Sequence, residues 1–232
     1  YFERAERRNL LKDIRLQDVV NYRKDLLQKA TPEMLVVGNL APERVTELAN
    51  TLKAHLKAGG ENLSRSDDVK VSKPQLANLQ RPGSSTDSAL AAVYVPTGYS
   101  ETESMAYSSV LGQIVQPWFY SQLRTEEQLG YAVFAFPTTV GRQMGIAFLL
   151  QSNSKQPAYL YQRYEDFYLK AQKRLREMSE EEFTQYKQGV MNELNQRPQT
   201  LGEEASRLRR DLDRENFAFD SREKLLEQIK PL

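Results

Sequence analysis

The sequence predicts an α+β fold, in which an antiparallel-rich sheet has helices packed on one face. Residues 89–95, 131–136 and 146–151 have the apolar or alternating pattern of strands. After residue 156, apolar side chains instead recur at three- and four-residue steps, which is the period of helices with one buried face. Strands that precede a run of helices favour an α+β domain over an alternating α/β one.

The first 60 residues are predicted to form a helix, a strand and a second helix. The segment 16–27 has helical apolar spacing, and Met34 to Val37 form a compact apolar strand. Pro42 suits the first turn of the following helix, because its missing N–H would have no helical partner there. The sequence turns small and polar after this helix, so we predict a linker at residues 61–73.

The second block, residues 74–232, is predicted to begin with a hairpin. Residues 75–80 and 89–95 form its strands, with a turn at residues 82–84. A long amphipathic helix follows and is expected to end at Gly130 in a left-handed conformation, which glycine adopts without a β-carbon clash. A strand then starts at Tyr131.

Helices are predicted to close the chain. One begins at Pro157, and two begin at the capping boxes Ser179 with Glu182 and Thr200 with Glu203. A last short helix carries Leu225, Leu226 and Ile229. The charged run 207–215 is interpreted as a solvated helix face.

Composition limits the possible functions. The 232 residues suffice for a real core, as one large domain or one domain with part of another. The 32 basic and 31 acidic residues nearly balance, so we expect no nucleic acid and no membrane as partners. The absence of cysteine excludes disulfides and thiol chemistry. The chain starts with Tyr1 rather than Met, so we expect a piece of a longer protein.

Arg124 and Tyr131 lie at the junction of the long helix and the following strand. If the strand folds back beside the helix, the guanidinium and the phenol would face one crevice. Such a pair offers hydrogen-bond donors but no redox or nucleophilic chemistry, which indicates binding. On spacing alone, however, a structural role is favoured, because Arg suits a helix C-terminus and Tyr suits a strand.

The motif around this junction changes that balance. Gln-Leu-Arg-Thr-Glu-Glu-Gln-Leu-Gly-Tyr at residues 122–131, with the apolar strand that ends Phe-Leu-Leu-Gln-Ser at residue 152, resembles the C-terminal domain of the pitrilysin and insulin-degrading-enzyme metallopeptidases. The resemblance implies four similarly folded repeat domains in two halves that close around a chamber. Residues 1–60 would be the C-terminal portion of the third domain, and 74–232 the fourth, a non-catalytic copy.

The resemblance also implies roles for particular residues. Arg124 and Tyr131 match the family positions that bind the substrate backbone near the scissile bond, and Tyr120 matches less specifically a position that lines the same pocket. Zinc would be held by the N-terminal catalytic half of the same polypeptide, which is the implied partner. The substrates would be peptides and small proteins, and the bacterial members of the family imply a periplasmic location.

This chain is not expected to hold the zinc or to be active alone. The family motif H-x-x-E-H needs two histidines, whereas the chain has only His55, with Ala58 and Gly59 at the positions that the motif would require. We interpret His55 as a surface residue near a helix end. Glu126 and Glu127 point about 100° apart on a helix, so they are interpreted as solvated rather than as a general-acid pair.

Two other functions stay open from the sequence. The same fold occurs in structural or substrate-presenting subunits, such as respiratory-complex core proteins and the non-zinc partner of mitochondrial processing peptidases. A free-standing peptide-binding module is the third interpretation. The presence of both Arg124 and Tyr131 favours the peptidase.

Overall fold

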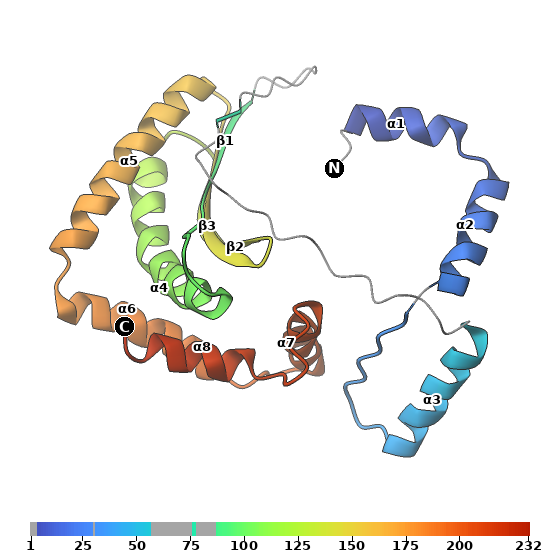
Figure 1. Ribbon diagram of the computed structural model, residues 1–232. Coiled ribbons are helices and arrows are strands. Elements are labelled where there is room, and N and C mark those ends of the chain that lie inside the picture. Colours follow the sequence, from blue (N-terminus) through green and yellow to red (C-terminus); the bar gives the residue numbers. More distant parts are fainter. Residues whose placement is uncertain (1–3, 30, 57–75, 78–86) are drawn as a thin grey trace. The chain divides into compact units, whose positions relative to one another are not determined.

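The computed structural model describes residues 4–29, 31–56, 76–77 and 87–232, and the chain divides into two compact units (Figure 1). The first unit comprises residues 1–65 and 199–209, and the second comprises residues 66–198 and 210–232. The predicted linker at residues 61–73 lies outside the described residues. So does the first strand of the predicted hairpin, except Leu76 and Ala77, which are not in a strand.

The first unit contains helices α1 (Arg4–Asp13), α2 (Leu16–Lys29) and α3 (Pro42–His55). The predicted helices α2 and α3 are confirmed, with Pro42 in the first turn of α3, whereas α1 was not predicted. The predicted strand at Met34–Val37 is wrong, because these residues belong to no sheet. A strand needs a neighbour for its hydrogen bonds, and the described residues of this unit include no other strand.

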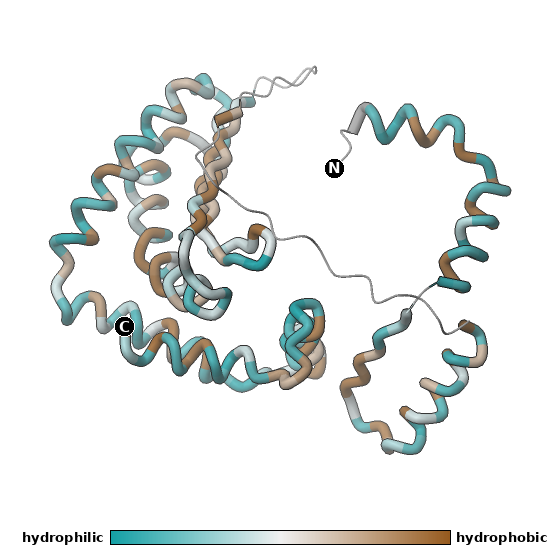
Figure 2. Tube along the Cα trace, viewed as in Figure 1, coloured by the Kyte–Doolittle hydropathy of each residue, from teal (hydrophilic) through white to brown (hydrophobic). Residues whose placement is uncertain are grey.

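In the described part of the first unit, the apolar side chains of α1 and α2 have no core to enter. Neither α2 nor α3 has a buried residue. Leu16 is 81% exposed and Tyr22 is 69% exposed, and Figure 2 shows the apolar residues interspersed along these helices. An amphipathic helix is normally stable because its apolar face packs against another element. The described part of the first unit does not supply that element.

The second unit is built on a three-stranded antiparallel sheet of β1 (Ser88–Tyr94), β2 (Ala132–Val140) and β3 (Gln143–Ser152). Its order is β1-β3-β2, so β3 is central. The three predicted strands are confirmed within a few residues. Val140 pairs with Gln143, which leaves a two-residue turn in which Gly141 has a φ of 61°. Hairpin turns of this length favour such positive φ values, and glycine adopts them readily.

Helices cover one face of this sheet (Figure 1). They are α4 (Glu101–Tyr120) and α5 (Pro157–Glu177), with α6 (Glu180–Asn195) and α8 (Ser221–Ile229) around them. The ring centroid of Phe119 in α4 lies 5.2 Å from that of Phe148 in β3 and 5.0 Å from that of Phe167 in α5, and both contacts are edge-on. This aromatic cluster joins the two helices to the central strand. The α+β class with helices on one face is thus confirmed.

The predicted helix starts are confirmed too. The Ser179 hydroxyl accepts a hydrogen bond from the amide of Glu182, and α5 begins at Pro157. The Thr200 hydroxyl likewise accepts one from the amide of Glu203 at the start of α7 (Leu201–Asp213). These starts were predictable because each cap lies within a few residues of the amides it satisfies.

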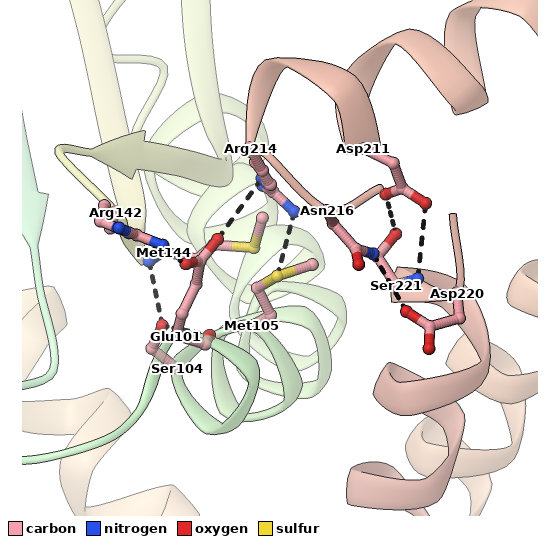
Figure 3. A network of polar contacts seen from close by, with 10 residues as sticks. All are labelled: Glu101, Ser104, Met105, Arg142, Met144, Asp211, Arg214, Asn216, Asp220 and Ser221. Carbon is pink, nitrogen blue, oxygen red and sulfur yellow. Dashed lines mark hydrogen bonds and ion pairs between the residues drawn. The ribbon is translucent and has the colours of Figure 1, made fainter. Parts of the chain in front are cut away.

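The charged run 207–215 is not simply a solvated face, contrary to the prediction (Figure 3). Asp211 is only 1% exposed, and its carboxylate accepts hydrogen bonds from the backbone and hydroxyl of Ser221 at the start of α8. Arg214 is 24% exposed and lies 3.8 Å from the carboxylate of Glu101. Helical spacing could not reveal this, because a buried carboxylate depends on donors that come from other elements.

Candidate functional site

The helix that carries Arg124 ends in an unusual turn. After Tyr120, α4 passes into the π-helical turn η1 (Ser121–Glu126), and the amide of Glu127 donates to the carbonyl of Gln122 at 2.9 Å. Such five-residue steps are rare and are frequent at functional sites. The π-turn displaces Arg124 from the position that a regular helix would give it.

Gly130 has a different role from the one predicted. The left-handed residue after the π-turn is Gln128, with a φ of 50°, and not Gly130. A β-carbon on Gly130 would lie 2.0 Å from the carbonyl oxygen of Gln151. That same oxygen accepts the amide of Tyr131 at 3.1 Å. Glycine is therefore needed for the close approach of the chain to β3 as it enters β2.

Glu127 ties the π-turn to α5. Its carboxylate accepts hydrogen bonds from two guanidinium N–H groups of Arg163, each at 2.7 Å, and from the side-chain amide of Gln122 at 2.9 Å. The hydrogen bonds from Arg163 lower the pKa of Glu127. The side chain of Glu127 is only 20% exposed, so its interpretation as a solvated residue is wrong, whereas Glu126 is exposed as predicted.

Arg124 is half-buried in this turn, yet its guanidinium makes no hydrogen bond or ion pair with any other residue that the structure describes. The half-buried Arg163 and Arg214, by contrast, both have carboxylate partners. Tyr120, one turn earlier, is 49% exposed, and its phenol has no bond to a described residue either. The donors of Arg124 and Tyr120 are thus available to a molecule outside this part of the chain.

Tyr131, which is 51% exposed, is held by a carboxylate. Its phenol donates to Oδ2 of Asp87 at 2.6 Å, and Nε2 of Gln151 donates to the same oxygen at 3.2 Å. The hydrogen bond to Asp87 raises the pKa of Tyr131. No hydrogen bond joins Tyr131 to Arg124, so the expected shared crevice stays a prediction.

A cavity of about 470 Å³ adjoins the π-turn, and Ser121, Gln122 and Glu126 of η1 form part of its lining. It is next to Trp118, whose ring has the guanidinium of Arg174 at 3.9 Å from its centre, and none of the three candidate residues lines it. Sequence reasoning also missed Asp87 and Arg163. Their partners are 44 and 36 residues away, so no local pattern indicated them.

The described residues do not fit a catalytic zinc site. His55 is the last residue of α3 and is exposed, as predicted, with Nδ1 2.8 Å from the carbonyl oxygen of Thr51. In the described ranges, no three His, Cys, Asp or Glu side chains are grouped closely enough to hold a metal ion. Among the same residues, no helix is both long and apolar enough to cross a membrane.

Comparison with known proteins places this geometry in a family. Residues 110–209 match the model of the PQQ synthase PqqF-like C-terminal lobe domain 4. All of the chain aligns with Protease 3 of Salmonella typhi, at 57% identity over 232 residues. The chain belongs to the pitrilysin and insulin-degrading-enzyme family. A more distant pitrilysin-family relative, insulin-degrading enzyme of Drosophila melanogaster, is 24% identical over 88% of the chain and 21% of its own length.

The fold agrees with that of a solved pitrilysin. The crystal structure of pitrilysin superimposes with a TM-score of 0.90 and 56% sequence identity, over 100% of this chain and 25% of the pitrilysin chain. The chain likewise covers 24% of the length of Protease 3. It therefore spans about a quarter of its pitrilysin-family relatives, whose other parts belong to the same polypeptide.

Proposed function

We propose that this chain is the non-catalytic C-terminal part of a zinc metalloendopeptidase that degrades peptides and small proteins. It binds the substrate backbone near the scissile bond through Arg124 and Tyr131, with Tyr120 beside them. The single observation that carries the proposal is the half-buried Arg124, which lies in a π-turn of the family motif without a partner among the described residues.

An arginine in this environment suits the recognition of a peptide carbonyl. Its guanidinium carries a permanent charge and several donors, and it is less hydrated than an ammonium group. The Glu127–Arg163 ion pair keeps the surrounding turn in place before the substrate arrives. A donor on a backbone turn that is already in place positions the substrate at a lower entropic cost than one on a mobile segment.

The sheet face opposite the described helices of the second unit adds an apolar wall. Val93 and Phe136 both pair with Ala147, so they lie in one row across the three strands. They are 51% and 44% exposed, and Phe134 on the same face is 53% exposed. Rows of this type suit contacts with the side chains of an extended peptide, which supports a place for this sheet in the wall of a closed chamber.

The partner in this proposal is the N-terminal catalytic half of the same polypeptide, which would supply the zinc. The apolar side chains exposed on α1 and α2 support such a partner, because the remaining three quarters of the relatives' length would cover them. The proposal places the polypeptide in the bacterial periplasm, in line with the family resemblance. Fractionation of cells that express the tagged full-length polypeptide tests that location, and a cytoplasmic signal would contradict it.

Substitutions in the assembled peptidase test the binding role. Arg124→Ala should lower kcat/KM for a quenched fluorescent peptide about 10- to 100-fold, because a charge-assisted contact is lost. Arg176→Ala removes an exposed arginine of α5 and serves as the control, with an unchanged rate. A wild-type rate for Arg124→Ala, in an assembly proved intact, would contradict the proposal.

The melting temperature separates this role from a structural one. Arg124 has no described partner to lose, so its replacement should leave the melting temperature within about 1–2 °C of the wild type. A large fall would instead identify Arg124 as a structural residue. The identity to proteins named Protease 3 favours the peptidase over the structural or substrate-presenting subunit.

A further inference from the structure

We propose that Asp87 is a positioning residue for Tyr131, which fixes the phenol and sets the direction of its hydrogen bond toward the substrate. The inference rests on the proposed function, because it concerns how Tyr131 binds a peptide backbone.

The ends of three strands bring the group together. Asp87 directly precedes β1, Tyr131 directly precedes β2, and Gln151 is the last residue but one of β3. Gln151 pairs with Ala89 on one side and with Ala132 on the other. The central strand thus aligns the two outer strands so that Asp87 and Tyr131 meet at one end of the sheet.

Two donors converge on one carboxylate oxygen. Oδ2 of Asp87 accepts the phenol of Tyr131 at 2.6 Å and the side-chain amide of Gln151 at 3.2 Å. The backbone carbonyl of Gln151 accepts the amide of Tyr131 at 3.1 Å. Tyr131 is therefore held at its backbone by Gln151 and at its phenol by Asp87, while about half of its surface stays exposed. An exposed tyrosine held at both ends is pre-organised for a ligand.

The direction of the bond decides what Tyr131 offers. A phenol has a single proton, and here that proton is donated to a carboxylate, which has none to give in return. The remaining lone pairs of the phenol oxygen can only accept a hydrogen bond. Arg124, in contrast, has donors only. The two residues are then complementary to the N–H and the C=O of a peptide backbone. Without Asp87, the phenol would be able to turn and donate to the carbonyl as Arg124 does.

The chain contains a matched pair for comparison. In α5, the phenol of Tyr161 donates to Glu165, also at 2.6 Å. This pair repeats the chemistry and the distance of the Tyr131–Asp87 pair, but it lies within one helix rather than at the junction of β1, β2 and β3. Glu165→Ala therefore controls for the general effect of releasing a tyrosine from a carboxylate.

The first test is a double-mutant cycle in the full-length peptidase, with kcat/KM for a quenched fluorescent peptide. Tyr131→Phe should lower kcat/KM about tenfold, and Asp87→Ala should cause most of that loss. The double variant should be no worse than Tyr131→Phe alone, because both changes remove the same interaction. Asp87→Asn keeps an acceptor oxygen for the phenol, so this variant should retain most of the wild-type kcat/KM. Glu165→Ala should leave the rate unchanged.

The second test does not depend on activity. The ultraviolet difference spectrum between the wild type and Tyr131→Phe isolates the titration of Tyr131, whose pKa Asp87 raises above the ordinary value of 10.0. Asp87→Ala should return that pKa to about 10, and Glu165→Ala should not change it.

The outcomes separate the two proposals. Full additivity in the cycle would overturn the role of Asp87 and leave the proposed function intact. The same conclusion would follow if Tyr131→Phe impaired cleavage while Asp87→Ala changed neither kcat/KM nor the pKa of Tyr131. A wild-type rate for Tyr131→Phe would refute the role of Tyr131 in the proposed function, and the role of Asp87 would fall with it.

Discussion

Replacement of Glu127 by alanine should loosen the π-turn that carries Arg124. The carboxylate of Glu127 receives two hydrogen bonds from Arg163 and one from Gln122. The two charged side chains are 20% and 23% exposed. The pair thus lies between exposed ion pairs, which contribute up to about 1 kcal/mol, and buried pairs, whose disruption costs about 3–5 kcal/mol. We expect a local cost of about 2 kcal/mol.

Hydrogen–deuterium exchange of the peptide 121–129 in the full-length polypeptide measures this cost. A loss of about 2 kcal/mol corresponds to exchange roughly 30-fold faster, when opening and closing are fast compared with exchange. Glu177→Ala is the control, because Glu177 forms an exposed ion pair with Lys173 in α5, the helix that also carries Arg163. That control should leave exchange unchanged. A change of less than about twofold for Glu127→Ala would refute the idea that this ion pair holds the turn.

Three further predictions concern the contacts that hold the second unit together. The pKa of Glu127 is lowered in the folded chain, so the protection of the π-turn from exchange should be complete above pH 4.5, the ordinary pKa of a glutamate, and should disappear as the pH falls through the lowered pKa. Exchange rates corrected for their intrinsic pH dependence measure this, and protection that persists in acid would contradict it. Gly130→Ala should cost about 3 kcal/mol in denaturant unfolding because of the clash with Gln151, whereas Gly189→Ala in α6, with no atom closer than 3.8 Å, should be neutral or stabilising. Asp211→Ala should speed exchange in α8 through a loss of about 1–3 kcal/mol, and equal exchange would refute its capping role.

Local chemistry made much of the fold predictable from the sequence. Pro42, Pro157 and Ser179 start helices because their conformational and capping effects act within one turn. The strands of the second unit were found because their partners are also in the chain. The apolar run Met34–Val37 has the same local pattern but no described partner strand, so its local preference alone does not make a sheet.

The candidate site was only partly predictable. The motif indicated Arg124 and Tyr131 through a family resemblance, and spacing alone would have left them as structural residues. The residues that position them could not be found, because Asp87 and Arg163 reach their partners only after the sheet and α5 have packed. The role of Gly130 was misjudged for a related reason. Its constraint comes from the carbonyl of Gln151 in another strand and not from the helix that it follows.

Cleavage of a quenched fluorescent peptide tests the central claim most directly. The rate is measured with this chain alone in the presence of zinc, and then after the chain is mixed with an N-terminal half that carries H-x-x-E-H. The account predicts no cleavage by the chain alone and cleavage on mixing. Cleavage by the chain alone that survives a chelator would show a catalytic site within these 232 residues. If neither the chain alone nor the mixture cleaves the peptide, although association of the halves is demonstrated, the substrate-binding role is contradicted.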